Sequence, residues 1–109
     1  MHKDDITYVE HILFCIRKIK KYMKGISKLK FKEDELLQDA VIRNIEIIGE
    51  ASRNISLEYR KTYPYIPWKE ITGMRDKLIH HYMGVDIDVI WTTIKQDIPI
   101  LEKELKSIK

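Results

Sequence analysis

Apolar side chains recur every three or four positions through the first half of the chain, with polar residues between them. This spacing gathers the apolar side chains on one face of an α-helix. It predicts two long amphipathic helices, over residues 4–24 and about 33–55, joined by a polar and basic linker. The apolar face of the first helix comprises Ile6, Val9, Leu13, Ile16 and Ile19 or Lys20. That of the second helix comprises Leu36, Leu37, Ala40, Val41, Asn44, Ile45, Ile47, Ile48 and Ala51.

Shorter apolar stripes, interrupted by prolines, follow in the second half of the chain. Ser56 can cap a short helical turn, which must end before Pro64. Pro67 is well placed as the first residue of a third helix, because its missing N–H has no partner at that position in any case. This third helix is expected to fade near Gly84.

A last helix is expected to begin near Asp86 or Asp88 and to run to the end of the sequence. Pro99 should kink it or divide it, since proline removes one backbone hydrogen bond and clashes with the preceding turn. No segment of convincing length alternates apolar and polar residues as a half-buried strand would. We therefore predict an all-α fold: one domain over residues 1–109, with four to five helices in an antiparallel bundle.

The composition excludes several classes of protein. With 44% hydrophobic and 34% charged residues among 109, the chain is too apolar to be disordered and too charged to be a membrane protein. Cys15 is the only cysteine, so neither an intrachain disulfide nor a cysteine-based zinc site is possible. The sequence contains no signal-peptide pattern and no stretch approaching the roughly 20 apolar residues of a membrane span. A cytoplasmic protein without membrane contact is expected.

The formal charge of +3 hides an uneven distribution. Residues 17–32, the basic segment, contain eight cations and no acid, which leaves a charge of −5 for the rest of the chain. Such a run attracts polyanions, with an affinity that falls as salt is added. The alternative is a solvated helix end, where lysines favour the negative pole of the helix dipole. The candidates for RNA contact are Lys18, Lys20, Lys21, Lys24 and Lys28.

The densest polar cluster runs from Arg75 to Tyr82 and contains an arginine followed five residues later by His80. Histidine exchanges a proton near neutral pH, and arginine can stabilise the charge of a phosphorane. Because RNA supplies its own nucleophile, the 2′-hydroxyl, this pair could cut RNA without a metal. On a regular helix, residues five apart differ by about 140° and ~7.5 Å. The two side chains could meet through the reach of Arg75, a break near the helix end, or pairing with a second subunit.

The other histidines do not extend this cluster to a metal site. Adjacent His80 and His81 point apart on a helix, and His2 offers no further ligand at helical metal spacing. Neither a zinc site nor a di-iron site is expected, and no cofactor is implied.

Three stretches of the chain, taken together, resemble one known family. They are residues 43–51, RNIEIIGEA; residues 67–82, PWKEITGMRDKLIHHY; and residues 85–101, which include VD, IW and DIPIL. In their order and in the length of the chain they are similar to the HepT-like toxins of the HEPN superfamily. Those toxins are the partners of minimal nucleotidyltransferases (MNT).

The resemblance implies a homodimeric helical bundle that acts as a metal-independent endoribonuclease on tRNA or mRNA, as the toxin of a type VII toxin–antitoxin pair. In the family's pattern Arg75 stabilises the phosphate and His80 is the acid and base, in a cleft shared by the two subunits. Tyr82 completes the pattern. In related pairs the cognate nucleotidyltransferase transfers AMP to this tyrosine, and the added bulk and negative charge would exclude RNA. Asp76 stands where the family often has Asn; it could orient Arg75, but it adds negative charge beside the scissile phosphate.

Residues around the motif have structural explanations beside functional ones. Glu50, on an otherwise apolar face, could bond to the motif or contact substrate, and Gly49 should permit close helix packing. Trp68 and Trp91 are expected in the core or a dimer interface, although an aromatic ring could stack on a base. Two other functions stay open: a non-enzymatic subunit that binds the nucleotidyltransferase and presents its substrate, and a plain RNA-binding dimer.

Overall fold

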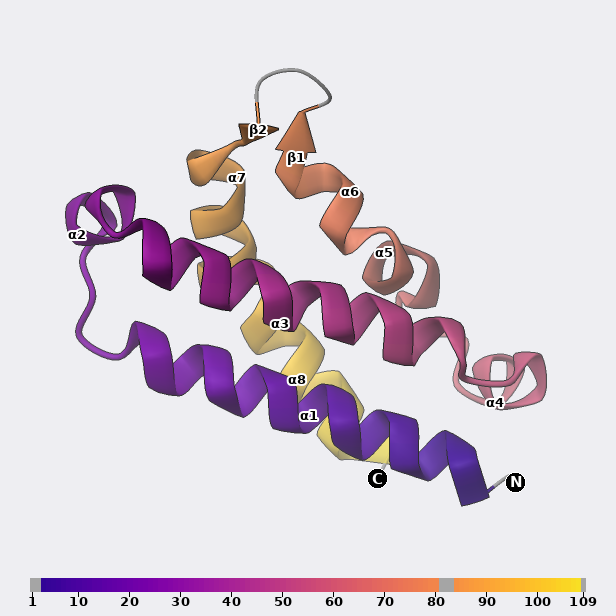
Figure 1. The fold of residues 1–109 in the computed structure, drawn as a ribbon. Helices are drawn as coiled ribbons and strands as arrows, with labels where there is room; N and C mark the ends of the chain where they lie inside the picture. Colours follow the sequence, from indigo (N-terminus) through magenta and orange to yellow (C-terminus); the bar gives the residue numbers. More distant parts are fainter. Residues whose placement is uncertain (1–2, 81–83, 109) are drawn as a thin grey trace.

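Two long antiparallel helices form one side of the fold (Figure 1). The computed structural model describes residues 3–80 and 84–108. Helix α1 spans Lys3–Met23 and α3 spans Glu35–Arg53, close to the predicted bounds. The apolar stripes of the two helices meet in the core. The fully buried side chains there include Ile12, Ile16, Ile19, Ile45 and Ile48.

Two residues expected on these apolar faces are exposed instead. Leu36 is 81% exposed, so the prediction that it belongs to the inner face of α3 is wrong. It lies nine residues before Ile45, and at about 100° per residue that spacing places it on the opposite side of the helix. Ile6 is also exposed. It lies six residues before Ile12, about 120° away around α1, at the edge of the apolar stripe.

The predicted linker between the two long helices contains a short helix. Helix α2 spans Lys28–Glu33, and the side chain of its N-cap, Ser27, accepts a backbone hydrogen bond from the first turn. Phe31 on α2 is fully buried, with its ring centroid 6.0 Å from that of Trp91. The sequence pattern missed this helix because a single buried residue makes no stripe. The part of the basic segment that lies in α2 is therefore anchored to the core through Phe31.

Helix α4 spans Leu57–Thr62 and begins at the predicted cap, Ser56. This cap is tied to α1, because the buried carboxylate of Asp5 accepts hydrogen bonds from both the N–H and the hydroxyl of Ser56, each at 2.7 Å. Helix α5 spans Trp68–Thr72, so it begins one residue after the predicted start at Pro67. Trp68 is buried in the core, as expected.

The predicted third helix is interrupted and ends early. Gly73 separates α5 from α6, which spans Met74–Leu78. The chain then forms strand β1, Ile79–His80, which pairs antiparallel with β2, Gly84–Val85. The N–H of Asp86 adds a hydrogen bond of 2.9 Å to the carbonyl of the last residue of α6. The prediction that the helix continues towards residue 84 is wrong, because the backbone pairs across two strands instead of along the helix.

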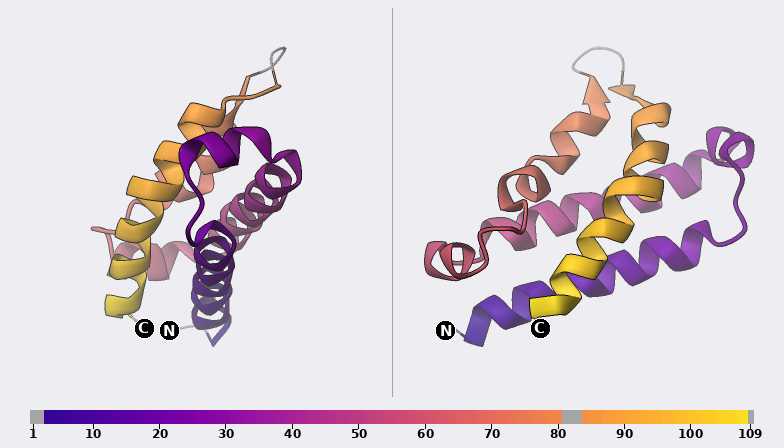
Figure 2. Two further views of the ribbon diagram at one scale, coloured as in Figure 1. Left: turned by 90° about the vertical axis from the view of Figure 1, so that its left-hand side faces the viewer. Right: turned by 180° about the vertical axis from the view of Figure 1, so that it is seen from behind.

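The C-terminal helix begins at the predicted place and is divided just before Pro99. Helix α7 spans Ile87–Thr92, and its N-cap is Asp86. A π-helical turn, η1, spans Thr93–Asp97, and α8 spans Ile98–Ile108. Since proline donates no hydrogen bond and crowds the preceding turn, the helix widens there. The rod formed by α7, η1 and α8 crosses the pair α1 and α3 (Figure 2).

Apart from the two short strands, the ordered elements of the described chain are helical, and the prediction of an all-α bundle is confirmed. Helix α3 lies between α1 on one side and α5 and α6 on the other (Figures 1 and 2). None of the helices in residues 3–80 and 84–108 is long and apolar enough to cross a membrane.

Candidate active site

The contact between α3 and α5 sets the position of α6. A Cβ atom at Gly49 would lie 3.3 Å from the carbonyl oxygen of Thr72, a tight contact with backbone, so this glycine permits the close packing that was expected. Beside it, the hydroxyls of Ser52 and Thr72 share a hydrogen bond of 2.8 Å. Helix α6 follows α5 directly and also contacts α3. The packing of α5 and α6 against α3 therefore fixes the position of the residues of α6.

Arg75 lies in the first turn of α6, with its side chain half exposed. Its Nε–H donates to Oε2 of Glu46 on α3, at 3.2 Å. Its Nη1 lies 3.6 Å from Oδ1 of Asp76, which is close enough for Asp76 to influence the orientation of the guanidinium. Because Glu46 takes the Nε–H, terminal N–H groups stay available to an anion. The arrangement suits an arginine that is to bind a phosphate.

His80 lies beyond the end of α6, in strand β1, where its backbone is paired with Gly84. Of the three ways in which Arg75 and His80 could meet, the structure contains the break at the helix end. The 140° separation expected on a regular helix therefore does not apply to this pair. The predicted AMP acceptor, Tyr82, lies outside the described residues.

The contact that the structure gives Glu50 is within its own helix, α3. Its carboxylate accepts a hydrogen bond from Arg53, three residues later on α3, and its side chain is 68% exposed. Glu46, one helical turn before it, pairs with Arg75 instead. Among residues 3–80 and 84–108, Glu50 is paired with Arg53, and its expected bond to the motif stays a prediction. The sequence signal for Glu46 was a second carboxylate four residues away on the same helix.

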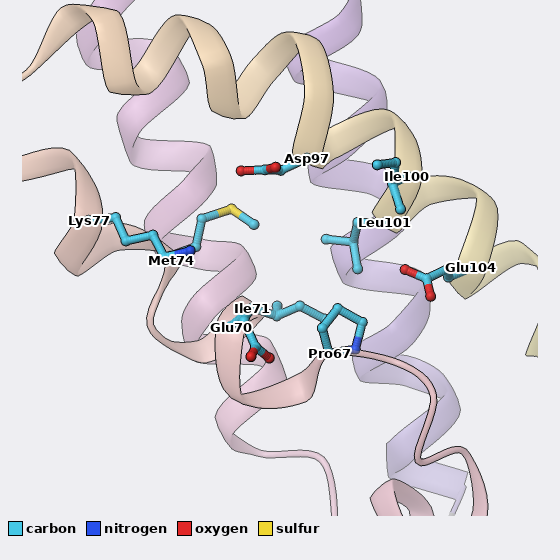
Figure 3. Close-up of a pocket in the computed structure, with 9 residues that line it drawn as sticks. All are labelled: Pro67, Glu70, Ile71, Met74, Lys77, Asp97, Ile100, Leu101 and Glu104. Carbon is cyan, nitrogen blue, oxygen red and sulfur yellow. The ribbon is translucent and has the colours of Figure 1, made fainter.

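A pocket of about 200 Å³ lies between α5 and α6 on one side and η1 and α8 on the other (Figure 3). Three carboxylates, from Glu70, Asp97 and Glu104, surround it, and Lys77 is its one cationic lining residue. Arg75 is not among the lining residues, and the acidic rim would repel a phosphate. Within residues 3–80 and 84–108, no group of three His, Cys, Asp or Glu side chains could hold a metal ion.

Intramolecular contacts occupy several cations of the basic segment. Lys28 and Lys32 of α2 lie 3.1 and 3.3 Å from the carboxylate of Asp88 on α7, and these two lysines lower its pKa. Lys20 Nζ donates to Glu102 Oε1 at 2.9 Å. The ammonium of Lys18 lies 5.6 Å from the centre of an aromatic ring on the same helix.

The exposed lysines of the basic segment include Lys21 and Lys24, at the end of α1. Helix α1 and helix α6 lie on opposite sides of α3 (Figures 1 and 2). The part of the basic segment that belongs to α1 is therefore separated from α6 by α3.

Comparisons with known proteins connect the whole chain to one family. A model of the family described as ribonuclease HepT-like matches residues 12–108. A protein of Thermococcus cleftensis named "Probable ribonuclease HepT" is 45% identical over 99% of this chain and 96% of its own length. A protein of Caldanaerobacter subterraneus subsp. tengcongensis named "Putative RNase" is 50% identical over 93% of this chain and 90% of its own length.

One similar protein is about twice as long. A protein of Methanocaldococcus jannaschii named "Gamma-glutamylcyclotransferase and putative RNase" is 48% identical over 99% of this chain, and the chain spans only 49% of it. No solved structure matches the chain.

Proposed function

The chain belongs to the HepT-like ribonucleases of the HEPN superfamily, and we propose that it cuts RNA without a metal, through Arg75 and His80. The observation that carries the proposal is the position of Arg75: it is held on α6 by Glu46 and still presents N–H groups to an anion. The break between α6 and β1 removes the geometric objection to a joint action with His80.

The chemistry follows from the two side chains. The imidazole of His80 takes the proton of the RNA 2′-hydroxyl, whose oxygen attacks the adjacent phosphorus. The guanidinium of Arg75 stabilises the negative charge that builds on the phosphoryl oxygens. The bond from phosphorus to the 5′-oxygen breaks, and the imidazolium of His80 gives its proton to that oxygen. The products are a 2′,3′-cyclic phosphate and a 5′-hydroxyl. The substrate, a tRNA or an mRNA, is bound in a cleft that two copies of the chain form as a homodimer.

The same proposal includes the control of the activity. The chain is the toxin of a type VII toxin–antitoxin pair, and its antitoxin is an MNT-type nucleotidyltransferase that attaches AMP to Tyr82. Tyr82 is the second residue after His80 in the sequence. An AMP there adds negative charge and bulk where the RNA phosphate must bind, and so excludes the substrate.

The test is RNA cleavage by the purified chain in the presence of EDTA, with mass spectrometry of the new ends. We expect cyclic phosphates, and a loss of rate of about 10²–10³ for Arg75→Ala and about 10²–10⁴ for His80→Ala. His11→Ala, at an exposed histidine of α1, is the matched control and should retain the activity. Uncut RNA, or cleavage that survives His80→Ala, would contradict the ribonuclease proposal. A stable complex with the nucleotidyltransferase that is indifferent to Arg75→Ala and not toxic would indicate a non-enzymatic subunit.

A further inference from the structure

A second feature of the surface is a groove between the C-terminal end of α1 and the π-helical turn η1. Its volume is about 590 Å³, within the range of about 300–1,000 Å³ that is usual for ligand sites. Two lysines of α1, a third directly after that helix and one from η1 line it, over a floor of apolar side chains, and its lining includes no acid. The lysines are Lys20, Lys21, Lys24 and Lys95, and the apolar residues include Met23, Ile94 and Pro99.

Lys95 is not part of the basic segment, and the fold alone brings it there. It belongs to η1, the segment that widens ahead of Pro99, and π-helical turns of this kind are frequent at functional sites. Its ammonium lies 4.7 Å from the centre of the Trp91 ring, which favours a defined position for the charge. The groove therefore combines cations from two parts of the chain that are distant in sequence.

The lysines of the groove differ in their availability. Lys20 is hydrogen-bonded to Glu102, whose side chain is only 11% exposed, so part of its charge is already neutralised. Lys21, Lys24 and Lys95 are exposed. Three cations thus border a concave apolar surface and attract a ligand that carries several negative charges along its length.

We propose that this groove binds the phosphodiester backbone of RNA, at a distance from the bond that is cut. The inference rests on the function proposed above, which supplies RNA as the substrate. Lysine ammonium groups contact phosphates without reading the sequence, and the apolar floor can receive the faces of riboses and bases. A membrane surface is the less suitable ligand, because the cations border a hollow, whereas membrane-binding residues form a protruding face. The groove strengthens binding of long RNA and takes no part in the chemical step.

The test compares two triple variants that remove the same charge. Lys21→Gln/Lys24→Gln/Lys95→Gln changes the groove, and Lys20 is left in place because its charge is already paired with Glu102. The control changes three exposed lysines outside the groove: Lys61→Gln/Lys69→Gln/Lys103→Gln. Both are made in a His80→Ala background, and binding of a fluorescein-labelled single-stranded RNA is measured across a series of salt concentrations. Thermal unfolding confirms that both variants fold.

We expect the groove variant to bind the RNA about tenfold more weakly at low salt. The slope of log affinity against log salt should become shallower by roughly 2, since each phosphate contact contributes about 0.7. The control should stay within about twofold of its parent. Equal losses in the two triple variants would overturn the inference, as would a groove variant that loses binding to phosphatidylserine vesicles but keeps its affinity for RNA.

Cleavage by chains with His80 intact separates this inference from the proposed function. The groove variant should raise KM for a long RNA and leave kcat unchanged, and it should cut a dinucleotide too short to reach the groove at the parent's rate. If the parent chain cuts no RNA while the groove variant still loses RNA binding, the ribonuclease proposal fails and the groove stands. If the parent cuts RNA and the groove variant has an unchanged KM and affinity, the groove inference alone fails.

Discussion

The ion pair between Glu46 and Arg75 leads to a prediction that sequence patterns do not provide. Glu46→Gln keeps an acceptor near Arg75 Nε but removes the negative charge that holds the guanidinium. The arginine should then spend more of its time in conformations that cannot meet the scissile phosphate. We therefore expect Glu46→Gln to cut RNA more slowly, even though Glu46 itself need not touch the substrate.

The size of the effect follows from the exposure of the pair. The Arg75 and Glu46 side chains are 50% and 32% exposed, and an ion pair of that exposure contributes roughly 0.5–1 kcal/mol. Since 1.4 kcal/mol is a factor of ten, the expected loss in kcat/KM is about two- to fivefold. The free energy of unfolding should change by no more than about 1 kcal/mol.

Initial rates of cleavage of a fluorophore–quencher RNA measure the loss, and urea denaturation measures the stability. Asp39→Asn is the matched control: it removes one negative charge from an exposed position on α3, seven residues before Glu46, and should cut RNA at the parent's rate. A Glu46→Gln variant that is as active as the parent, or more active, would refute the reasoning. In that case the pair would compete with the phosphate for Arg75 instead of positioning it.

Three further predictions concern the fold. Asp5→Ala removes two hydrogen bonds from the N-cap of α4 and should lower the free energy of unfolding by about 2–3 kcal/mol in urea denaturation, whereas the exposed Asp4→Ala should change it little. Burial raises the pKa of the Cys15 thiol and outweighs the opposing effect of Lys18, so native protein should react with iodoacetamide far more slowly than urea-unfolded protein, by mass spectrometry; equal rates would contradict its burial. Two lysines lower the pKa of Asp88, so its contribution to stability is present above the unfolded-state pKa and is lost as pH falls through the folded-state pKa. Asp88→Asn should flatten the acid side of a plot of stability against pH, and an unchanged plot would contradict the assignment.

Local signals accounted for most of the helices. Ser56 and Asp86 cap helices at the predicted places, because a capping side chain bonds to the backbone two or three residues away. Proline limits the neighbouring helix in the same local way, so Pro99 predicted the division of the last helix. The end of α6 gave no such signal, and the N-cap of α2, Ser27, precedes no apolar stripe. Strand pairing with residues 84–85 ends α6, and burial of Phe31 against Trp91 stabilises α2.

Periodicity, caps and motif spacing depend on neighbours along the chain, so the sequence predicted the helical class of the fold and proposed Arg75 and His80 as the candidate site. Only the tertiary structure shows which charged side chains pair with one another. Of the two carboxylates one turn apart on α3, the sequence singled out Glu50, whereas the packing of α6 on α3 pairs Arg75 with Glu46, 29 residues away. Likewise Lys20 is paired with Glu102, 82 residues away, while Lys21 stays exposed. Contacts between residues so distant in sequence depend on how the helices cross, which no local pattern records.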